Sequence, residues 1–165
     1  MATGNTIDIF MVQGAELPAA GYAQFDTRNN HSVLDFDAAT AESGYFSSVM
    51  PRHYGGGGLT AYVHGAFSSA IGGSGVLELS FERIGHDTLD IDTDSFASPK
   101  SFHFPASATN GNVIISSGIG FSNGAEIDSV AVGEAYRLMI KRTAAHASDN
   151  AAGDFELLAI ELKET

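Results

Sequence analysis

The histidines are the first side chains to consider for metal or acid–base chemistry, because the imidazole ring binds metals and titrates near neutral pH. They show no HxH, HxxxH or HxxE spacing and are spread along the chain at His31, His53, His64, His86, His103 and His146. A cupin-like metal site normally shows a clustered pair on one strand, so we predict no such site. His64 and His103, both on expected strands, are the two that could share one.

The most acidic stretch of the chain suggests a second kind of chemistry. Asp90, Asp92 and Asp94 recur at every second position, and converging carboxylates are ligands that Ca²⁺ prefers. An EF-hand is excluded, because its sixth position would be Ser95 instead of Gly and its twelfth Ser101 instead of Glu. A looser calcium site in a loop stays open. We favour a charged edge strand or loop that prevents strand addition by neighbouring molecules.

The remaining residues do not predict cofactor binding or covalent catalysis. The phosphate-binding pattern GxxxxGK is absent, since no Gly–Lys pair occurs in the chain. The absence of cysteine excludes disulfides and thiolate chemistry. Carboxylates such as Glu126, Asp128 and Glu134 could pair with Arg137 and Lys141 across a sheet. We therefore predict no enzyme activity, no catalytic residue and no cofactor.

The charge of the chain restricts its partners. Eight Lys and Arg stand against twenty Asp and Glu, giving a formal net charge of −12. This charge repels phosphate backbones and anionic membrane surfaces, so we expect neither nucleic-acid nor membrane binding. The first residues lack the basic start and apolar stretch of a signal peptide, and we expect synthesis in the cytoplasm.

Strands must position these side chains, and residues 55–84 show the clearest ones. Apolar residues there alternate with polar residues at a period of two, which is typical of half-buried strands. The apolar positions are Leu59, Ala61, Val63, Leu77, Leu79 and Phe81. Further strands are expected at residues 7–12, 33–37, 44–50, 101–104, 113–121, 136–141 and 155–164. The Asn110–Gly111 pair predicts a hairpin turn, and a short helix is expected near residues 38–43.

About eight to ten short strands, spaced by turn signals and without a sustained helical period, predict an all-β protein. A two-sheet antiparallel β-sandwich is the natural closure, and strand number and length favour a jelly-roll-like topology over an immunoglobulin-like one. We expect a single β-sandwich domain over residues 21–165. Residues 1–20, with a thinner pattern around Pro18, are expected to form an N-terminal arm or edge element.

Several segments together resemble small proteins encoded in the structural-gene blocks of tailed bacteriophages. The resemblance covers residues 58–164 and lies in GLTAYVHG, LELSFERI, LDIDTDSF, FSNGAEIDSV, GEAYRLMIKR and AGDFELLAIELKE. It implies a virion protein on the outer head surface that decorates or cements the capsid as a homotrimer bound to the major capsid protein. The residues expected to contact the capsid or another copy are Ile7, Ile9, Phe10, Met11, Tyr54 and Tyr62.

An alternative function stays open beside capsid decoration. A tail or fibre module that recognises a host surface glycan would also be a β-sandwich. It could use Tyr54, Tyr62 and His64, together with calcium bound by the acidic loop that contains Asp90 and Asp94.

Overall fold

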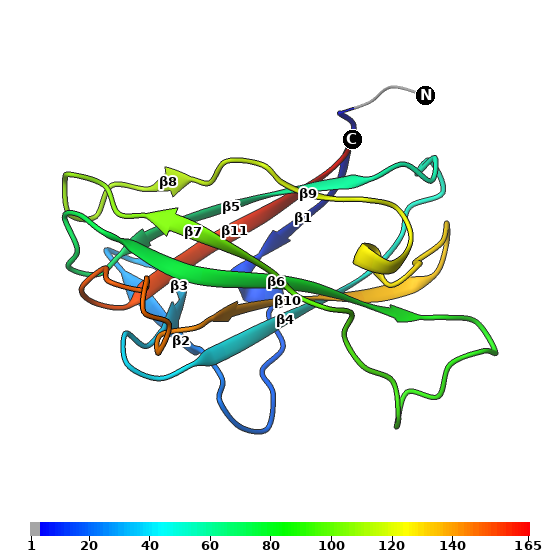
Figure 1. The fold of residues 1–165 in the computed structure, drawn as a ribbon, viewed down its shortest axis with the longest axis horizontal. Helices are drawn as coiled ribbons and strands as arrows, with labels where there is room; N and C mark the ends of the chain where they lie inside the picture. Colours follow the sequence, from blue (N-terminus) through cyan, green and yellow to red (C-terminus); the bar gives the residue numbers. More distant parts are fainter. Residues whose placement is uncertain (1–3) are drawn as a thin grey trace.

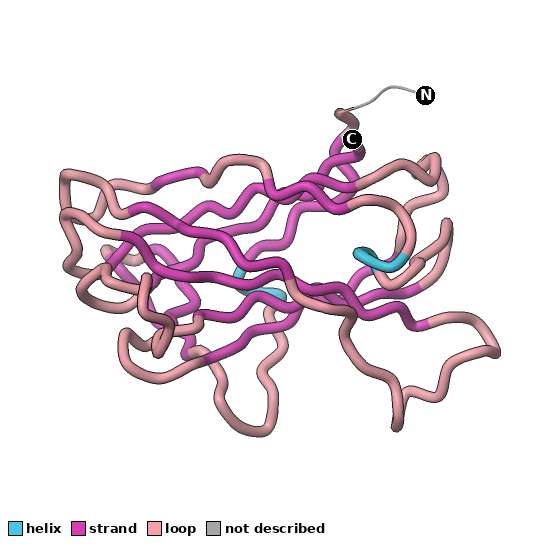
Figure 2. The backbone as a smooth tube through the Cα atoms, in the orientation of Figure 1, coloured by secondary structure: helices cyan, strands magenta, loops and turns pink. Residues whose placement is uncertain are grey.

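The computed structural model describes residues 4–165, which form two antiparallel sheets packed face to face (Figure 1, Figure 2). Sheet A has the strand order β2 (Gln24–Arg28), β3 (His31–Phe36), β11 (Phe155–Glu164), β5 (Leu59–Phe67) and β8 (Ile114–Ile115). On its flanks β1 (Thr6–Met11) pairs with β11, and β9 (Ile119–Phe121) pairs with β5. Sheet B has the order β4 (Glu42–Val49), β10 (Ala135–Arg142), β6 (Ser74–Ile84) and β7 (Lys100–Pro105).

The predicted two-sheet antiparallel β-sandwich with jelly-roll-like character is confirmed. Helical structure among residues 4–165 is confined to two 3-10 turns, η1 (Val12–Gly14) and η2 (Ala125–Ile127). Within this described part of the chain, no helix is long and apolar enough to cross a bilayer.

The core lies between the sheets and follows the alternation of the sequence. On β6, Leu79 and Phe81 are fully buried and stand opposite Ile140 and Leu138 of β10. At one end of the core, four phenylalanine rings meet with centroid separations of 4.8–6.2 Å: Phe36, Phe67, Phe104 and Phe155. Burying each ring contributes roughly 1.5–3 kcal/mol, so this aromatic cluster is a main source of stability.

A buried ion pair closes the same end of the sandwich. Arg142 is fully buried, and its guanidinium donates to both carboxylate oxygens of Asp149 over 2.8 and 3.1 Å. Further bonds run to the carbonyl oxygens of Phe36, Ala151 and Gly153. Because a buried charge is tolerated only when it is paired and hydrogen-bonded, this network ties the β10–β11 connection to sheet A.

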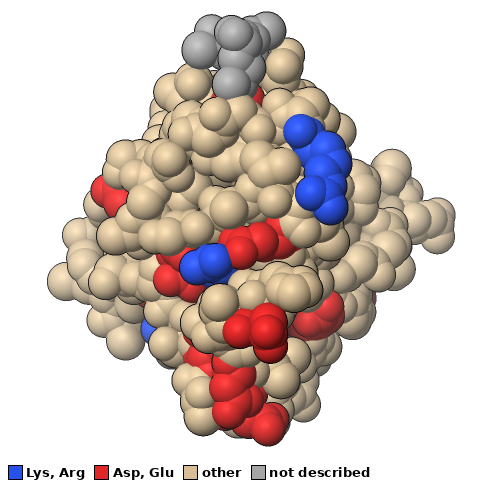
Figure 3. All heavy atoms as spheres, turned by 90° about the vertical axis from the view of Figure 1, so that its right-hand side faces the viewer, with Lys and Arg blue, Asp and Glu red and all other residues tan. Residues whose placement is uncertain are grey.

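Residues 85–99, the long β6–β7 loop, cover part of the outer face of sheet B. The Ser80 hydroxyl donates to the carbonyl of Ala97. Arg137 forms an ion pair with Glu82 and lies 5.2 Å from the ring of Phe96. Ser80 and Glu82 point outward as predicted, but this cover makes them buried. The end of the molecule from which the loop projects carries more acidic than basic groups (Figure 3).

The N-terminal segment lies within the sandwich, at the edge of sheet A. Among residues 4–165, strand β1 pairs with β11 alone, and the core residues Ile7 and Phe10 are 8% and 6% exposed. The backbone N–H of Glu164 donates to the carbonyl of Asn5 over 2.9 Å. Residues 1–20 were expected to form either an arm or an edge element. From residue 4 onwards, this segment forms an edge element and does not project as an arm.

Residues 38–43 do not form the expected helix. The Asp37 carboxylate accepts the N–H groups of Ala39 and Thr40 over 2.7 and 2.6 Å, which satisfies the backbone in a turn. These two hydrogen bonds also lower the pKa of Asp37. Strand β4 begins directly afterwards at Glu42, so no room remains for a helical turn.

The predictions for residues 110–121 were only partly correct. Asn110 and Gly111 form a turn, but it connects β7 of sheet B to β8 of sheet A and is therefore no hairpin. The long strand expected at residues 113–121 is divided into β8 and β9. Between them the Ser116 hydroxyl accepts the N–H of Val63 over 2.9 Å, so a side chain replaces the backbone acceptor that a continuous ladder would supply.

Candidate functional site

The outer face of sheet A is built from residues that alternate with core positions. Met11, Ala159, His64 and Ile115 are cross-strand neighbours on β1, β11, β5 and β8. Side chains directly opposite each other in antiparallel strands share a face, so these four form one row. Met11 and Ile115 are about half exposed, at 50% and 57%. The row is therefore an apolar strip in contact with solvent, with the imidazole of His64 within it.

A second row lies beside the first, towards the C-terminal end of β11. It consists of Ile9, Glu161 and Tyr62, again in direct register across three strands. Ile9 is 58% exposed. Beyond this row, Thr60, Tyr62 and Lys163 line a shallow hollow of about 340 Å³. Tyr62 is thus an aromatic side chain placed between the apolar strip and this hollow.

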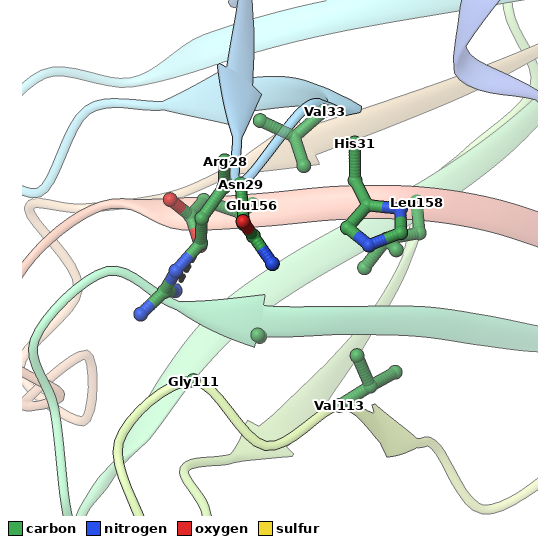
Figure 4. Close-up of a pocket in the computed structure, with 9 residues that line it drawn as sticks. Arg28, Asn29, His31, Val33, Gly111, Val113, Glu156 and Leu158 are labelled. Carbon is green, nitrogen blue, oxygen red and sulfur yellow. Dashed lines mark hydrogen bonds and ion pairs between the residues drawn. The ribbon is translucent and has the colours of Figure 1, made fainter.

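A larger hollow of about 460 Å³ lies on the same face, where β11 begins (Figure 4). Its lining combines apolar groups with polar ones that can hydrogen-bond: Arg28, Asn29, His31, Val33, Ala66, Gly111, Val113, Glu156 and Leu158. In Figure 4, Arg28 and Glu156 lie at one side of the hollow, and His31 and Leu158 lie at the other. Small-molecule sites typically show this combination of an apolar surface with a few fixed polar groups.

The polar side of this hollow is held rigidly by Arg28. Its guanidinium forms an ion pair with Glu156, which is only 8% exposed. It also donates to the carbonyl of Phe67 over 3.0 Å and to Asn110 Oδ1 over 3.3 Å. A forked donor with several fixed acceptors loses little further freedom when a ligand binds, so this side of the hollow is preorganised.

Acidic side chains surround this ion pair. Asp35 stands directly opposite Glu156 in the sheet. Partial burial, and then the nearby charges of Asp154, Glu156 and Asp26, raise the pKa of Asp35 to about 6. Because carboxylates exceed the one guanidinium, the field around the hollow disfavours an anionic ligand.

The structure separates the two histidines that the sequence suggested as partners. His64 lies on β5 of sheet A, whereas His103 lies on β7 of sheet B. Both alternate with core positions and point outward, so they lie on opposite faces of the sandwich. A shared site for them is therefore wrong.

The residues proposed for capsid or self contact divide into two groups. Ile9 and Met11 are exposed and Tyr62 is partly exposed, all on the outer face of sheet A. Ile7, Phe10 and Tyr54 are buried in the core. The Tyr54 hydroxyl donates to the carbonyl of Gly57. Burial, and then the charge of Glu164, raise the pKa of Tyr54. These three side chains are therefore not available to a partner.

The acidic loop does not gather its carboxylates. Asp90 Oδ1 accepts the N–H of Asp92 over 3.0 Å, and Asp94 Oδ1 accepts the N–H of Ser95 over 2.9 Å. Among residues 4–165, no group of three His, Asp or Glu side chains lies close enough to hold a metal ion. The loop also lies over sheet B, away from Tyr62 and His64, so the geometry does not favour calcium-assisted binding there.

The expected cross-sheet pairs form with other partners. Glu134 pairs with Arg83 over 2.6 Å, and Glu126 pairs with Lys100 over 2.7 Å. The hydrogen bond from Lys100, followed by those from Ser122, lowers the pKa of Glu126 to about 2. These pairs fix the loops around η2 and do not line the hollow.

Residues 120–124, with the sequence GFSNG, match the nucleophile pattern GxSxG, although no catalytic residue was predicted. The Ser122 hydroxyl donates to Glu126 over 2.8 Å. In the described part of the chain no histidine hydrogen-bonds to it, so the activating base of a triad is not assembled.

The sequence analysis did not identify Arg28, Glu156, His31 and Leu158 as site residues. One feature of the sequence could have pointed to Leu158: apolar residues in the segment 155–164 fall on both faces of the strand instead of alternating with polar ones. The pairing of β11 with β5 shifts register between Leu157 and Ala159, and this irregularity presents Leu158 to the hollow. The partners of that strand could not be read from the sequence.

Comparisons with known proteins identify the fold. No protein-family model and no curated protein sequence matches the chain. The CBM22-2 xylan-binding domain of Paenibacillus barcinonensis Xyn10C superposes with a TM-score of 0.51 at 8% identity, over 96% of this chain and 99% of that one. The CBM22-1–GH10 modules of Clostridium thermocellum xylanase 10B, complexed with xylohexaose, give 0.50 at 12% identity, over 98% of this chain and 29% of that one. At such identities the likeness establishes the β-sandwich fold alone.

Proposed function

We propose that this protein is a non-catalytic glycan-binding module whose ligand lies along the outer face of sheet A. The observation that carries the proposal is the preorganised hollow of about 460 Å³, continued by an apolar strip on the same face. The likeness in fold to a xylan-binding domain and to a module complexed with xylohexaose supports this choice.

The chemistry of the face fits a sugar chain. A pyranose ring presents apolar C–H groups as well as hydroxyls, so it needs apolar contact together with hydrogen-bonding groups. Leu158, Val113 and Ile115 supply the apolar contact, and His31 and Asn29 supply hydrogen-bonding groups.

The dimensions of the face favour an extended ligand. From Glu156 to Lys163, strand β11 runs beneath the face for about 20 Å, which is long enough for several linked pyranose rings. The hollows at Arg28 and at Lys163 mark the two ends of this path. The acidic surroundings favour a neutral polysaccharide over one that carries carboxylate or sulfate groups.

A binding screen with matched variants tests the proposal. Retardation of the protein in gels that contain neutral polysaccharides should identify a ligand, and anionic polysaccharides should have no effect. Leu158→Asp and His31→Ala should abolish or strongly weaken the retardation. His103→Ala, an exposed strand histidine on the opposite face, should not. Absence of binding to every neutral polysaccharide, or binding that the two hollow variants leave unchanged, would refute the proposal.

Capsid decoration is a second candidate function, favoured by one observation. Ile9 and Met11 expose apolar side chains on the edge strand β1, where another copy or the major capsid protein could pack. Labelling of this protein on purified phage particles distinguishes the two functions. Label at threefold-symmetric positions on the head surface would support decoration, whereas label at the tail or fibre tip would support recognition of a host glycan.

A further inference from the structure

Two Asn–Gly pairs lie in exposed turns of this protein. They occur in the closely similar sequences Thr109–Asn110–Gly111 and Ser122–Asn123–Gly124. Both asparagines are exposed, and both glycines have positive φ, +82° at Gly111 and +100° at Gly124. In such a pair the backbone nitrogen of glycine can attack the side-chain amide carbon of asparagine, because no glycine side chain obstructs the approach. The sequence alone does not distinguish the two positions.

The surroundings of Asn110 promote this attack. Its Oδ1 accepts a hydrogen bond from Arg28 Nη2 over 3.3 Å. A charged donor on a carbonyl oxygen polarises the carbon and stabilises the negative charge that develops on the oxygen during nucleophilic attack. Among residues 4–165, no acceptor takes the backbone N–H of Gly111, so the nucleophile is free.

The surroundings of Asn123 oppose it. The N–H of Gly124 donates to Asn123 Oδ1 over 2.9 Å, and Asn123 Nδ2 donates to the carbonyl of Gly56 over 2.9 Å. The nucleophile and the leaving amide are therefore both engaged in hydrogen bonds. Asn123 provides an internal control with nearly the same local sequence.

We infer that Asn110 is a site of spontaneous deamidation promoted by Arg28. The Gly111 nitrogen loses its proton to hydroxide and bonds to the Asn110 side-chain carbon, while Oδ1, held by Arg28, carries the negative charge. The carbonyl then re-forms as the bond to the amide nitrogen breaks. That nitrogen takes a proton from water and leaves as ammonia, which gives a cyclic succinimide. Water opens the ring at either carbonyl to give aspartate or isoaspartate, and no oxidant or reductant is needed.

The reaction changes the candidate binding face. It places a new carboxylate within reach of the guanidinium that holds Glu156. The rim of the larger hollow gains one negative charge, and Arg28 is shared between two carboxylates. The inference itself does not depend on glycan binding.

The test compares the two asparagines within one molecule. The folded protein is incubated at mildly alkaline pH, and peptide mass spectrometry follows the amide-to-acid conversion at each position. We expect Asn110 to convert about tenfold faster than Asn123, and the two rates to become similar in urea, where the folded contacts are lost. Equal rates in the folded protein, or the same ratio in urea, would overturn the inference.

An Arg28→Gln variant tests the role of the guanidinium. We expect the Asn110 rate to fall about three- to tenfold, less than the ~10²–10³ that a buried oxyanion donor contributes, because Asn110 is exposed. An unchanged Asn110 rate in the folded variant refutes that role. The Asn123 rate reports whether the variant is folded, since unfolding raises it to the value in urea. If Arg28→Gln is unfolded, Arg28→Lys is used in its place, because lysine keeps the charge but not the forked geometry. Its Asn110 rate should lie between that of the unchanged protein and the three- to tenfold lower rate expected without the guanidinium.

Discussion

Asp35 lies near the end of β3 and Asp37 directly follows that strand. Ionisation of these two carboxyl groups should affect the stability of the fold in opposite directions. Partial burial and neighbouring carboxylates raise the pKa of Asp35 from 3.8 to about 6. Ionisation of Asp35 is therefore easier in the unfolded chain than in the folded one. The stability associated with the neutral carboxyl is present below about pH 4 and is lost as the pH rises to about 6.

The magnitude follows from the change in pKa. A rise from 3.8 to about 6 corresponds to about 3 kcal/mol without screening. Because the carboxyl is only partly buried, solvent screening reduces this to about 1 kcal/mol. Asp35→Asn removes the ionisation, so it should raise the free energy of unfolding by about 1 kcal/mol at pH 8 and leave it nearly unchanged at pH 4.

Urea unfolding followed by circular dichroism at pH 4 and pH 8 measures both values. Asp37→Asn is the control, because hydrogen bonds from the backbone N–H groups of Ala39 and Thr40 lower the pKa of Asp37. Its charged form stabilises the fold, so this variant should lose stability at pH 8 and less at pH 4. The reasoning is wrong if Asp35→Asn destabilises the protein at pH 8, or if both variants shift stability in the same direction there.

Three further predictions concern the buried ion pair, a crowded glycine and the acidic loop. Asp149→Ala leaves the fully buried guanidinium of Arg142 without its carboxylate. This should lower the free energy of unfolding by about 3–5 kcal/mol. A decrease of less than about 1 kcal/mol in a urea titration would contradict the prediction. In Gly65→Ala the new Cβ would lie 2.5 Å from the ring of Phe155 and 2.9 Å from the carbonyl oxygen of Glu156. This substitution should lower the free energy of unfolding by about 1–3 kcal/mol. Gly14→Ala, whose new Cβ would meet no atom within 4 Å, should leave it nearly unchanged in the same assay. Calcium should leave the melting temperature unchanged, because the carboxylates of the acidic loop do not converge. If calcium raises the melting temperature and Asp90→Asn abolishes this rise, the prediction is wrong and the loop binds calcium.

Much of the fold could be predicted because the side-chain alternation records which face of each strand is buried. Leu79 and Phe81 on β6, and Leu138 and Ile140 on β10, lie in the core as their period of two requires. The strand predicted over residues 155–164 is confirmed as β11, which has neighbours on both sides in sheet A.

The remaining features depend on contacts that a local pattern does not record. Between β8 and β9, the hydroxyl of Ser116 accepts the backbone N–H of Val63 in place of a carbonyl oxygen. Tyr54 packs in the core, where its hydroxyl donates to the carbonyl of Gly57. The hollow joins Arg28 to Glu156, which are 128 positions apart in the sequence. Only the pairing order of β2, β3 and β11 brings these two side chains together.

Mapping the ligand contacts on the protein is the most direct test of the proposed binding face. At 17.2 kDa the chain suits amide chemical-shift titration by NMR, with the neutral polysaccharide fragment that binds best in the screen. We predict that the largest shifts fall on residues of the larger hollow and the adjoining strip, such as His31, His64, Glu156 and Leu158. Shifts confined to the outer face of sheet B, or to the loops around Gly56 and Asn123, would contradict the account.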